Sequence, residues 1–400
     1  MRVILVIVAA TLLAGSIAAA QAPKVSVGAD QLIIDLSLLQ GKRVGLVTHL
    51  AGVTRDGEAT AGALVRRRGI DLRALFAPEH GISGALGAGV AVPDLMERTP
   101  VFSLYGETFR PTPRMLRRVD VLVIDLQDVG VRAYTYASTM AYVMMAARDA
   151  GLPVIVLDRP NPLGGLTVDG PVLEPHLRSF IGMYPIPYVH GLTLGELARL
   201  INGAFRIGAN LTVVPMKGWE RPMVWADTGL PWIRPSPGIP SADTAFYFAI
   251  TGSIDGTNLW NGTGTESRFQ VVLAPWLKGS TLAERLNRLR LPGVRFTPSA
   301  VPHPRTGKTW YGIRVHITDP RVLRPSTITV HILAEIRRLH GGRLVFSQPR
   351  RGAPMFDRVW GTKAVRLALQ RGEPAAAIVA RWKPGLLKFQ RLREQYVLYR

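Results

Sequence analysis

The sequence predicts an α/β fold: a largely parallel sheet with helices on both faces, followed by a smaller C-terminal α/β region. Between Lys42 and Trp219, apolar runs alternate with segments of helical periodicity. These runs are apolar on both faces, which is typical of parallel strands buried between two layers of helices. The alternation stops in residues 219–267, which are rich in Pro, Gly and Trp, and then resumes.

The order of the elements supports this fold class. In the first unit, strands are predicted in residues 43–50, 72–81, 99–106, 119–130, 152–162 and 210–219, and helices in 59–69, 112–119, 136–151 and 192–205. In the second unit, strands are predicted in 269–277, 294–301 and 310–319, and helices in 281–289, in 326–341 and at the C-terminus. Strands that are separated by helices indicate parallel pairing.

The length of 400 residues exceeds one comfortable core, so we place a domain boundary near Gly238. We predict a signal peptide in 1–20, a catalytic domain in 21–238 and an auxiliary domain in 239–400. The auxiliary domain begins within the Pro-, Gly- and Trp-rich stretch. With so many aromatic residues, this stretch is more typical of a functional cleft segment than of disorder.

The N-terminus has the layout of a secretory signal. One basic residue precedes an apolar run over residues 3–13, and a triplet of small residues ends at Ala20. We predict cleavage after Ala20 and an exported chain, periplasmic or secreted, without stable membrane insertion. An uncleaved anchor is the alternative, because the run extended through the alanines just spans a bilayer. The sequence has no cysteine, which excludes disulfides and thiolate metal sites.

The formal net charge is +21 at pH 7, and its positive side is mostly arginine spread over the whole chain. Nucleic-acid binding would favour a basic stripe or a recognisable reader motif, and the sequence has neither. We therefore predict no nucleic-acid partner. The charge indicates either attraction to an anionic substrate or surface, or an arginine-rich proteome.

Polar or titratable side chains follow the predicted strands of the first unit where each strand ends. In open α/β sheets, ligands bind in the crevice outside the carboxyl ends of the strands, so we place the site at this edge. The strand-end residues are His49, Glu79, His80, Tyr105, Gln127, Asp128, Asp158 and Arg159.

Motifs that would identify a nucleotide site or a familiar hydrolase are missing. No G-x-G-x-x-G follows a strand and opens a helix, and the segment near Thr306 lacks the upstream glycine of a P-loop. Neither G-x-S-x-G nor H-E-x-x-H occurs. No spacing of His, Asp and Glu suggests a metal, so we predict neither a cofactor nor a metal.

Carboxylates remain, and paired carboxylates are the groups that hydrolyse glycosides. Glu79, whose backbone is fixed behind Pro78, is the candidate general acid, and a surface salt bridge is the alternative. Asp128 follows the most buried run and is either a second site carboxylate or a turn residue that accepts backbone N–H bonds. Asp158 precedes Arg159, and pairing between them explains both without catalysis.

Cationic and aromatic residues complete the candidate set. Arg132 and Arg159 suit an anionic ligand group because arginine offers a bidentate fork, and surface ion pairing is the alternative. Tyr134 and Tyr136 are expected either to contact a sugar or to pack in the core. His190 is expected either to hydrogen-bond a ligand or to act as a capping or core histidine. Further lining candidates, which would otherwise pack in the core, are Trp232, Trp260 and Trp276.

Several segments occur together in one order: LFAPEHG, VFSLYG, DLQDVGVRAYTY, VLDRPNPLGG, GPVLEP, YPIPYVHGLTLGELA, GLPWIRPSP and GTNLWNGTGT. As a set they make the chain resemble the DUF1343 family, which is represented by NamZ-type exo-β-N-acetylmuramidases. The resemblance covers almost everything after the predicted signal. It implies a Rossmann-like catalytic domain, an auxiliary domain across a cleft, and cofactor-independent removal of N-acetylmuramic acid from non-reducing ends of peptidoglycan fragments.

The resemblance also implies roles for single residues. It makes Glu79 a catalytic residue and places a family motif on Gln127, Asp128, Gly130, Arg132, Tyr134, Thr135 and Tyr136, and a second motif on His190. The lactyl carboxylate of the substrate would give Arg132 or Arg159 a ligand. The sequence departs from the family at His49, where asparagine is usual, and at Asn261 and Thr263, where an acid and a base are usual.

The leading hypothesis is therefore an exported glycosidase with Glu79 as general acid. Asp128, and next Glu174, is the candidate second carboxylate, unless the acetamido group of the substrate acts as nucleophile. The alternative is a non-catalytic protein of the same fold that binds cell-wall fragments. The predicted substrate-binding residues are His49, His80, Gln127, Arg132, Tyr134, Tyr136, Asp158, Arg159, Asn161, His190 and Asn258.

Overall fold

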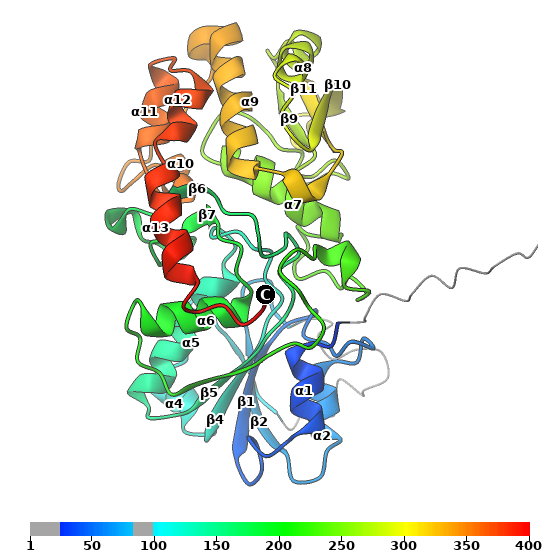
Figure 1. Ribbon diagram of the computed structural model, residues 1–400, viewed down its shortest axis with the longest axis vertical. Coiled ribbons are helices and arrows are strands. Elements are labelled where there is room, and N and C mark those ends of the chain that lie inside the picture. Colours follow the sequence, from blue (N-terminus) through cyan, green and yellow to red (C-terminus); the bar gives the residue numbers. More distant parts are fainter. Residues whose placement is uncertain (1–24, 83–98) are drawn as a thin grey trace, which may run out of the picture.

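The first unit is built around a six-stranded parallel sheet (Figure 1). The computed structural model describes residues 25–82 and 99–400, so the predicted signal peptide in 1–20 lies outside the described residues. The sheet order is β3-β2-β1-β4-β5-β8. Its strands are β1 (Arg43–Thr48), β2 (Asp71–Ala77), β3 (Val101–Ser103), β4 (Val121–Asp125), β5 (Val154–Leu157) and β8 (Leu211–Val214).

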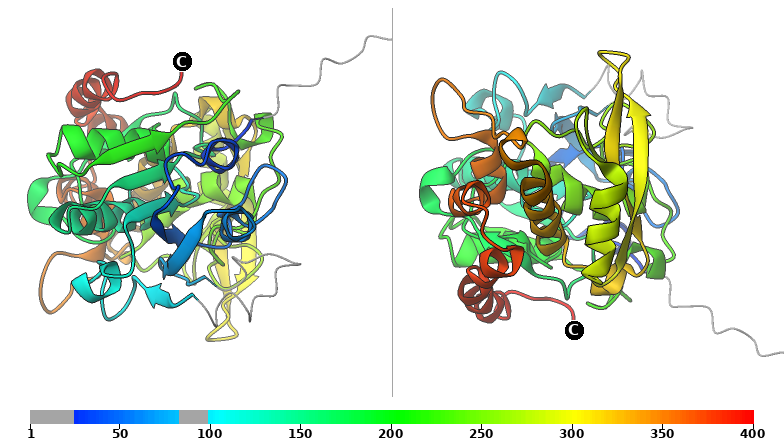
Figure 2. Two further views of the ribbon diagram at one scale, coloured as in Figure 1. Left: turned by 90° about the horizontal axis from the view of Figure 1, so that it is seen from below. Right: turned by 90° about the horizontal axis from the view of Figure 1, so that it is seen from above.

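Each strand buries alternate side chains in two different layers. In β4, Leu122 and Ile124 pack towards helices α4 (Pro113–Leu116), α5 (Tyr136–Asp149) and α6 (Leu194–Gly203). Val121 and Val123 pack towards α1 (Gly28–Ile34) and α2 (Thr60–Val65) on the other face. Figure 2 shows these two groups of helices on opposite sides of the strands. The double burial explains why the runs are apolar at every position and confirms the predicted fold class.

The strand order reverses between β1 and β4. From β1 the chain moves outward through β2 to β3, and then crosses back to β4 and moves outward through β5 to β8. All these pairs are parallel, so the strand-end residues share one edge of the sheet. The point of reversal is where open α/β sheets bind ligands.

The second unit contains a smaller antiparallel sheet, ordered β10-β11-β9. Its elements are β9 (Val271–Ala274), α8 (Gly279–Arg288), β10 (Val294–Pro302), β11 (Thr309–Ile317), α9 (Pro325–His340), α10 (Met355–Trp360), α11 (Ala364–Gln370), α12 (Ala375–Ala380) and α13 (Lys383–Arg393). Short 3₁₀ turns occur at η1 (Pro175–Leu177), η2 (Trp225–Asp227), η3 (Gly252–Ile254), η4 (Pro320–Val322) and η5 (Gly341–Arg343).

Two elements differ from the sequence-based expectation. The stretch 219–267 is not irregular throughout, because it contains helix α7 (Ala242–Thr251), whose N-cap Ser241 accepts the Thr244 N–H. Residues 169–189 contain a short antiparallel pair, β6 (Asp169–Val172) and β7 (Pro187–Val189), which the sequence did not indicate.

The two units share one hydrophobic core. A single cluster of buried side chains runs from Ile124 in the first sheet to Leu333 in α9 and Trp360 in α10. The indole N–H of Trp360 donates to the carbonyl of Ser253 at 2.8 Å. The units are therefore packed together and not joined only by a linker. Within residues 25–82 and 99–400, no helix is long and apolar enough to cross a membrane.

Candidate functional site

Glu79 lies in a tight turn directly after β2. The turn includes His80 (φ 73°) and Gly81 (φ 75°), both in the left-handed region. Thr135, at the N-cap of α5, donates its hydroxyl to Oε2 of Glu79 at 2.7 Å. A hydrogen bond to Glu79 raises the pKa of Tyr105, which follows β3. Glu79 is half-buried and held from two sides, whereas the side chain of His80 is exposed.

Asp128 lies in the turn after β4 and is 7% exposed. Its Oδ1 accepts the N–H of Gly130 at 2.7 Å. Its Oδ2 is buried and has no hydrogen-bond partner within the described part of the chain. Burial raises the pKa of Asp128 to about 7, because desolvation disfavours the charged form. Asp128 is therefore a carboxyl group that exchanges a proton near neutral pH and has one oxygen that no other described residue bonds.

Tyr136 lies near both of these carboxylates. Its hydroxyl donates to the carbonyl of Pro235 at 2.6 Å and lies 3.5 Å from the carbonyl of Glu79. Burial raises the pKa of Tyr136, and the charges of Glu79 and Asp128 add to the effect. Its ring packs edge-to-face on Tyr134 at 4.8 Å. The two tyrosine rings therefore pack together. Strand β1 alone separates β2, which Glu79 follows, from β4, which Asp128 follows, so the backbones of β2 and β4 are about 10 Å apart.

His49 follows β1 and lies where the strand order reverses, between β1 and β4. The backbone N–H of Gln127 donates to Nε2 of His49 at 2.9 Å, so Nδ1 carries the proton and donates to the Pro235 carbonyl at 3.1 Å. Burial lowers the pKa of His49 to about 4. Both ring nitrogens are used within the protein, so His49 links β1 to the loops at Gln127 and Pro235, and its predicted contact with a ligand stays a prediction. The Gln127 side chain donates to the carbonyls of Asp128 and Pro160.

Arg159 does not face a ligand, contrary to the sequence-based expectation. Its guanidinium donates two hydrogen bonds to the carboxylate of Asp125, at 2.5 and 2.8 Å, and one to the carbonyl of Val53 at 2.6 Å. Arginine and aspartate are both buried. A buried bidentate ion pair of this kind links β4 to the end of β5. It leaves few guanidinium N–H groups of Arg159 to bind a lactyl carboxylate.

Asp158 is likewise structural, although it was predicted to bind substrate. It is fully buried and accepts the Thr193 hydroxyl, the Gly195 N–H and the Tyr399 hydroxyl, each at 2.7 Å. These partners are the first turn of α6 and the C-terminal tail. Burial raises the pKa of Asp158 to about 6.

Arg132 is 2% exposed and joins the two units. Its guanidinium donates to the carbonyls of Pro171, Ile186 and Val359 at 2.7 to 2.9 Å. The first two carbonyls belong to the β6–β7 region, and the third belongs to α10 of the second unit. Backbone carbonyls use the two terminal nitrogens, whereas the buried Nε has no hydrogen-bond partner among the described residues, and the predicted contact with a lactyl carboxylate stays a prediction.

Asn161 and His190 both hydrogen-bond to loop backbone, whereas the buried Nε2 of His190 has no partner within the described residues, and their predicted contact with substrate stays a prediction. Asn161 accepts the Leu163 N–H and donates to the Leu192 carbonyl. His190 accepts the Leu192 N–H through Nδ1, and burial lowers the pKa of His190 to about 3. The physical reason is the same for both: loops that follow buried strands carry backbone groups that need partners.

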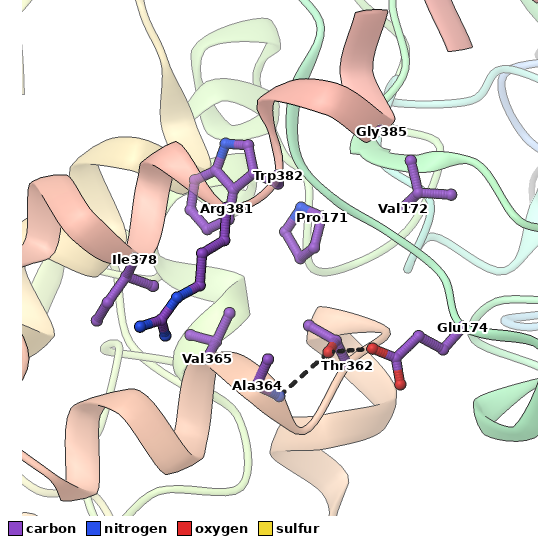
Figure 3. Close-up of a pocket in the computed structure, with 10 residues that line it drawn as sticks. All are labelled: Pro171, Val172, Glu174, Thr362, Ala364, Val365, Ile378, Arg381, Trp382 and Gly385. Atoms are coloured by element: carbon purple, nitrogen blue, oxygen red, sulfur yellow. Dashed lines mark hydrogen bonds between the residues drawn. The ribbon is translucent and has the colours of Figure 1, made fainter. Parts of the chain in front are cut away.

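Glu174 lines a different cavity, of about 230 Å³, at the seam between the units (Figure 3). Its carboxylate accepts the Thr362 hydroxyl at 2.6 Å. The lining contains none of the strand-end residues around Glu79 and Asp128: it consists of Pro171, Val172, Glu174, Thr362, Ala364, Val365, Ile378, Arg381, Trp382 and Gly385. Asn258 lies elsewhere again, bonded to backbone groups of Arg343 and Val345.

The unusual pair Asn261 and Thr263 is bonded internally. The Thr263 hydroxyl donates to Oδ1 of Asn261 at 2.6 Å, and Nδ2 of Asn261 donates to the Thr251 carbonyl. A neutral pair thus stands where the family resemblance leads us to expect an acid and a base. Trp260 donates its indole N–H to the Thr263 carbonyl. Trp232 and Trp276 pack against Trp225 and His340.

Thr135 is the site residue whose function the sequence did not reveal. It belongs to the YTY segment, but only the fold shows that its hydroxyl reaches Glu79, which is 56 residues away. Its position directly before a predicted helix was the available signal. Among residues 25–82 and 99–400, no group of three or more His, Cys, Asp or Glu is arranged to hold a metal ion.

Comparisons with known proteins agree along the whole described chain. The family model "Exo-beta-N-acetylmuramidase NamZ, N-terminal" matches residues 44–243, and its C-terminal counterpart matches residues 246–399. A protein of Bacillus subtilis (strain 168), named Peptidoglycan beta-N-acetylmuramidase NamZ, is 41% identical over 389 residues, which cover 95% of this chain and 92% of the relative.

Solved structures give the same result. A DUF1343 family protein from Bacteroides fragilis NCTC 9343 has a TM-score of 0.87 and 38% identity, and covers 94% of this chain and 99% of its own. A second DUF1343 protein of that organism has a TM-score of 0.73 and 29% identity with the same coverage. By its sequence and its fold, this chain belongs to the exo-β-N-acetylmuramidase NamZ family, whose solved members carry the name DUF1343.

Proposed function

We propose that this protein is an exo-acting glycoside hydrolase that releases N-acetylmuramic acid from the non-reducing ends of peptidoglycan fragments. The observation that carries the proposal is the pair Glu79 and Asp128 at one edge of the sheet, both near enough to Tyr136 to raise its pKa. The activity for which the 41% identical relative is named supports this substrate class.

Glu79 is the general acid in this proposal. It is half-buried, so a glycosidic oxygen can reach it, and Thr135 fixes the direction of its carboxyl group. The proton moves from Glu79 to the glycosidic oxygen while the bond between that oxygen and the anomeric carbon breaks. The resulting Glu79 carboxylate then accepts a proton from the water that completes hydrolysis.

Asp128 supports the anomeric centre. Its unbonded Oδ2 accepts the N–H of the substrate's acetamido group, which turns the acetamido carbonyl oxygen towards the anomeric carbon. That oxygen displaces the leaving group, and the negative charge of Asp128 stabilises the cyclic cation that forms. If Asp128 instead activates water directly, the released sugar has inverted configuration, and NMR of the first-formed anomer distinguishes the two routes.

The test compares two substrates and two matched glutamates. Glu79→Gln should lower kcat/KM about 10²- to 10⁴-fold for the disaccharide of N-acetylmuramic acid and N-acetylglucosamine. Its effect on N-acetylmuramyl fluoride should be much smaller, because fluoride leaves without a proton. Glu174→Gln, in the separate cavity, should leave both rates unchanged.

Two outcomes would contradict the proposal in different ways. Equal release of sugar from the disaccharide by wild type and Glu79→Gln would remove Glu79 from its role and leave the activity intact. Binding of the disaccharide without release by wild type would instead support the non-catalytic alternative, a protein that binds cell-wall fragments.

We also propose export, on the signal-like layout of residues 1–20. Fractionation of cells followed by N-terminal sequencing should find a chain that begins at Gln21 in the periplasmic or secreted fraction. A chain that begins at Met1 in the cytosolic fraction would contradict this proposal.

A further inference from the structure

A group of aromatic side chains at the surface, the aromatic platform, adjoins Glu79; two of its members are exposed and two are half-buried. It consists of Tyr105, Phe109, Tyr142 and Phe180. Tyr105 is 45% and Phe109 36% exposed. The Phe109 and Phe180 ring centres lie 4.4 Å apart, Tyr105 lies 5.6 and 5.9 Å from them, and Tyr142 stacks on Phe180 at 6.3 Å. Large aromatic side chains that gather at a surface mark a binding site more often than scattered ones do.

The platform has a fixed position relative to the carboxylates. Tyr105 follows the edge strand β3, Glu79 follows β2 and Asp128 follows β4, so Glu79 lies between the other two in the order of the sheet. Tyr105 is close enough to Glu79 for the interaction with that carboxylate to raise the pKa of Tyr105, which places the platform beside the candidate acid. Tyr142 lies seven residues after Thr135 on α5, so it is about 10 Å along that helix from the residue that bonds Glu79.

We propose that the aromatic platform binds the first sugar of the leaving group, the ring that carries the glycosidic oxygen. This inference rests on the proposed function. A general acid protonates the oxygen between two sugars, so the sugar to be released lies on the Asp128 side and the rest of the chain lies on the other side. The apolar C–H face of a pyranose packs against the exposed rings of Phe109 and Tyr105.

The position also argues against a peptide as the occupant. In an N-acetylmuramic acid substrate, a stem peptide is attached through the lactyl group of the sugar that is released. That sugar lies on the Asp128 side of Glu79, whereas the platform lies beyond Glu79 at the sheet edge. The leaving-group sugar is the part of the substrate nearest to Tyr105.

The test uses Phe109→Ala with the peptide-free disaccharide and with N-acetylmuramyl fluoride, which has no leaving-group sugar. We expect KM for the disaccharide to rise about 5- to 10-fold with kcat nearly unchanged, as for the loss of one aromatic contact. Both constants for the fluoride should stay as in wild type. Phe109→Trp should restore KM, and Tyr311→Ala, an exposed aromatic residue of β11, is the matched control.

The outcomes separate this inference from the proposed function. If wild type hydrolyses both substrates and Phe109→Ala has an unchanged KM for the disaccharide, the platform assignment is wrong and the activity stands. Equal losses on both substrates would also overturn it, as would an effect seen only with a peptide-bearing disaccharide. If wild type hydrolyses neither substrate, the proposed function fails and this inference fails with it. Phe180→Ala supplies a second variant if Phe109→Ala does not fold.

Discussion

At the scale of single residues, the strand ends carry two kinds of polar group that look alike in the sequence. Asp128 keeps one oxygen without a partner among the described residues, whereas Asp158 has every donor it needs. Both are acids that follow an apolar run. The partners of Asp158 lie 35 and 241 residues away, at Thr193 and Tyr399, so local sequence does not reveal them. The sequence therefore predicted that these acids lie at the carboxyl edge of the sheet, but it did not predict which groups each side chain contacts.

The raised pKa of Asp128 leads to a prediction about stability. The folded value of about 7 lies above the ordinary 3.8, so the folded protein binds this proton more tightly than the unfolded chain does. The contribution of Asp128 to stability is present below pH 4 and is lost as the pH rises towards 7. Asp128→Asn should therefore be more stable than wild type at pH 8, by on the order of a few kcal/mol, although it loses activity.

Urea unfolding at pH 4.5, 6 and 8 measures this effect. The difference in the free energy of unfolding between Asp128→Asn and wild type should grow with pH and level off above about pH 7. A difference that is constant over the whole range would show that the carboxyl group does not titrate in the folded protein as its burial requires.

At the scale of elements, the strands of the large sheet were readable because they are apolar on both faces. The pair β6 and β7 was not, because both strands are short and contain proline, which weakens the strand signal. Helix α7 was not predicted, because Pro- and Gly-rich residues surround it in the sequence. Its buried residues Ala245, Phe246, Ala249 and Ile250 nevertheless have helical spacing.

The N-terminus of α6 leads to a second prediction. A β-carbon at Gly195 would come within 2.6 Å of the Asp158 carboxyl carbon, although alanine normally favours a helix. Gly195→Ala should therefore lower the free energy of unfolding by more than about 2 kcal/mol. Gly385→Ala, in the first turn of α13 and 3.3 Å from a methyl group of Val172, should change it by less than about 1 kcal/mol. Similar losses in both variants would contradict this explanation.

At the scale of the whole molecule, the C-terminal tail returns from the second unit to the first. Figure 1 shows the C-terminus beside α6, between the two units. The Tyr399 hydroxyl donates to Asp158, and the Leu398 N–H donates to Glu196 at 2.9 Å. The Arg221 N–H donates to the carbonyl of Arg400 at 3.0 Å. The tail therefore completes the hydrogen bonding of buried acids in the first unit.

Changes in the tail should destabilise the first unit. Tyr399→Phe, which removes only the hydroxyl, should lower the free energy of unfolding by about 1–3 kcal/mol. Deletion of residues 397–400 should lower it further, because Glu196 and Arg221 also lose partners. Thermal unfolding followed by tryptophan fluorescence measures both changes, and a truncated chain with the Tm of wild type would contradict this assignment.

The bond between Tyr399 and Asp158 also sets an order of events during synthesis. A ribosome that adds about 5–20 residues per second needs about 12–48 s to cover the 241 residues that separate them. Throughout that interval the nascent first unit has a buried acid that lacks one of its donors. Until residue 399 has been made, the first unit therefore lacks the stabilisation that this hydrogen bond adds, and a chaperone meets a less stable fold.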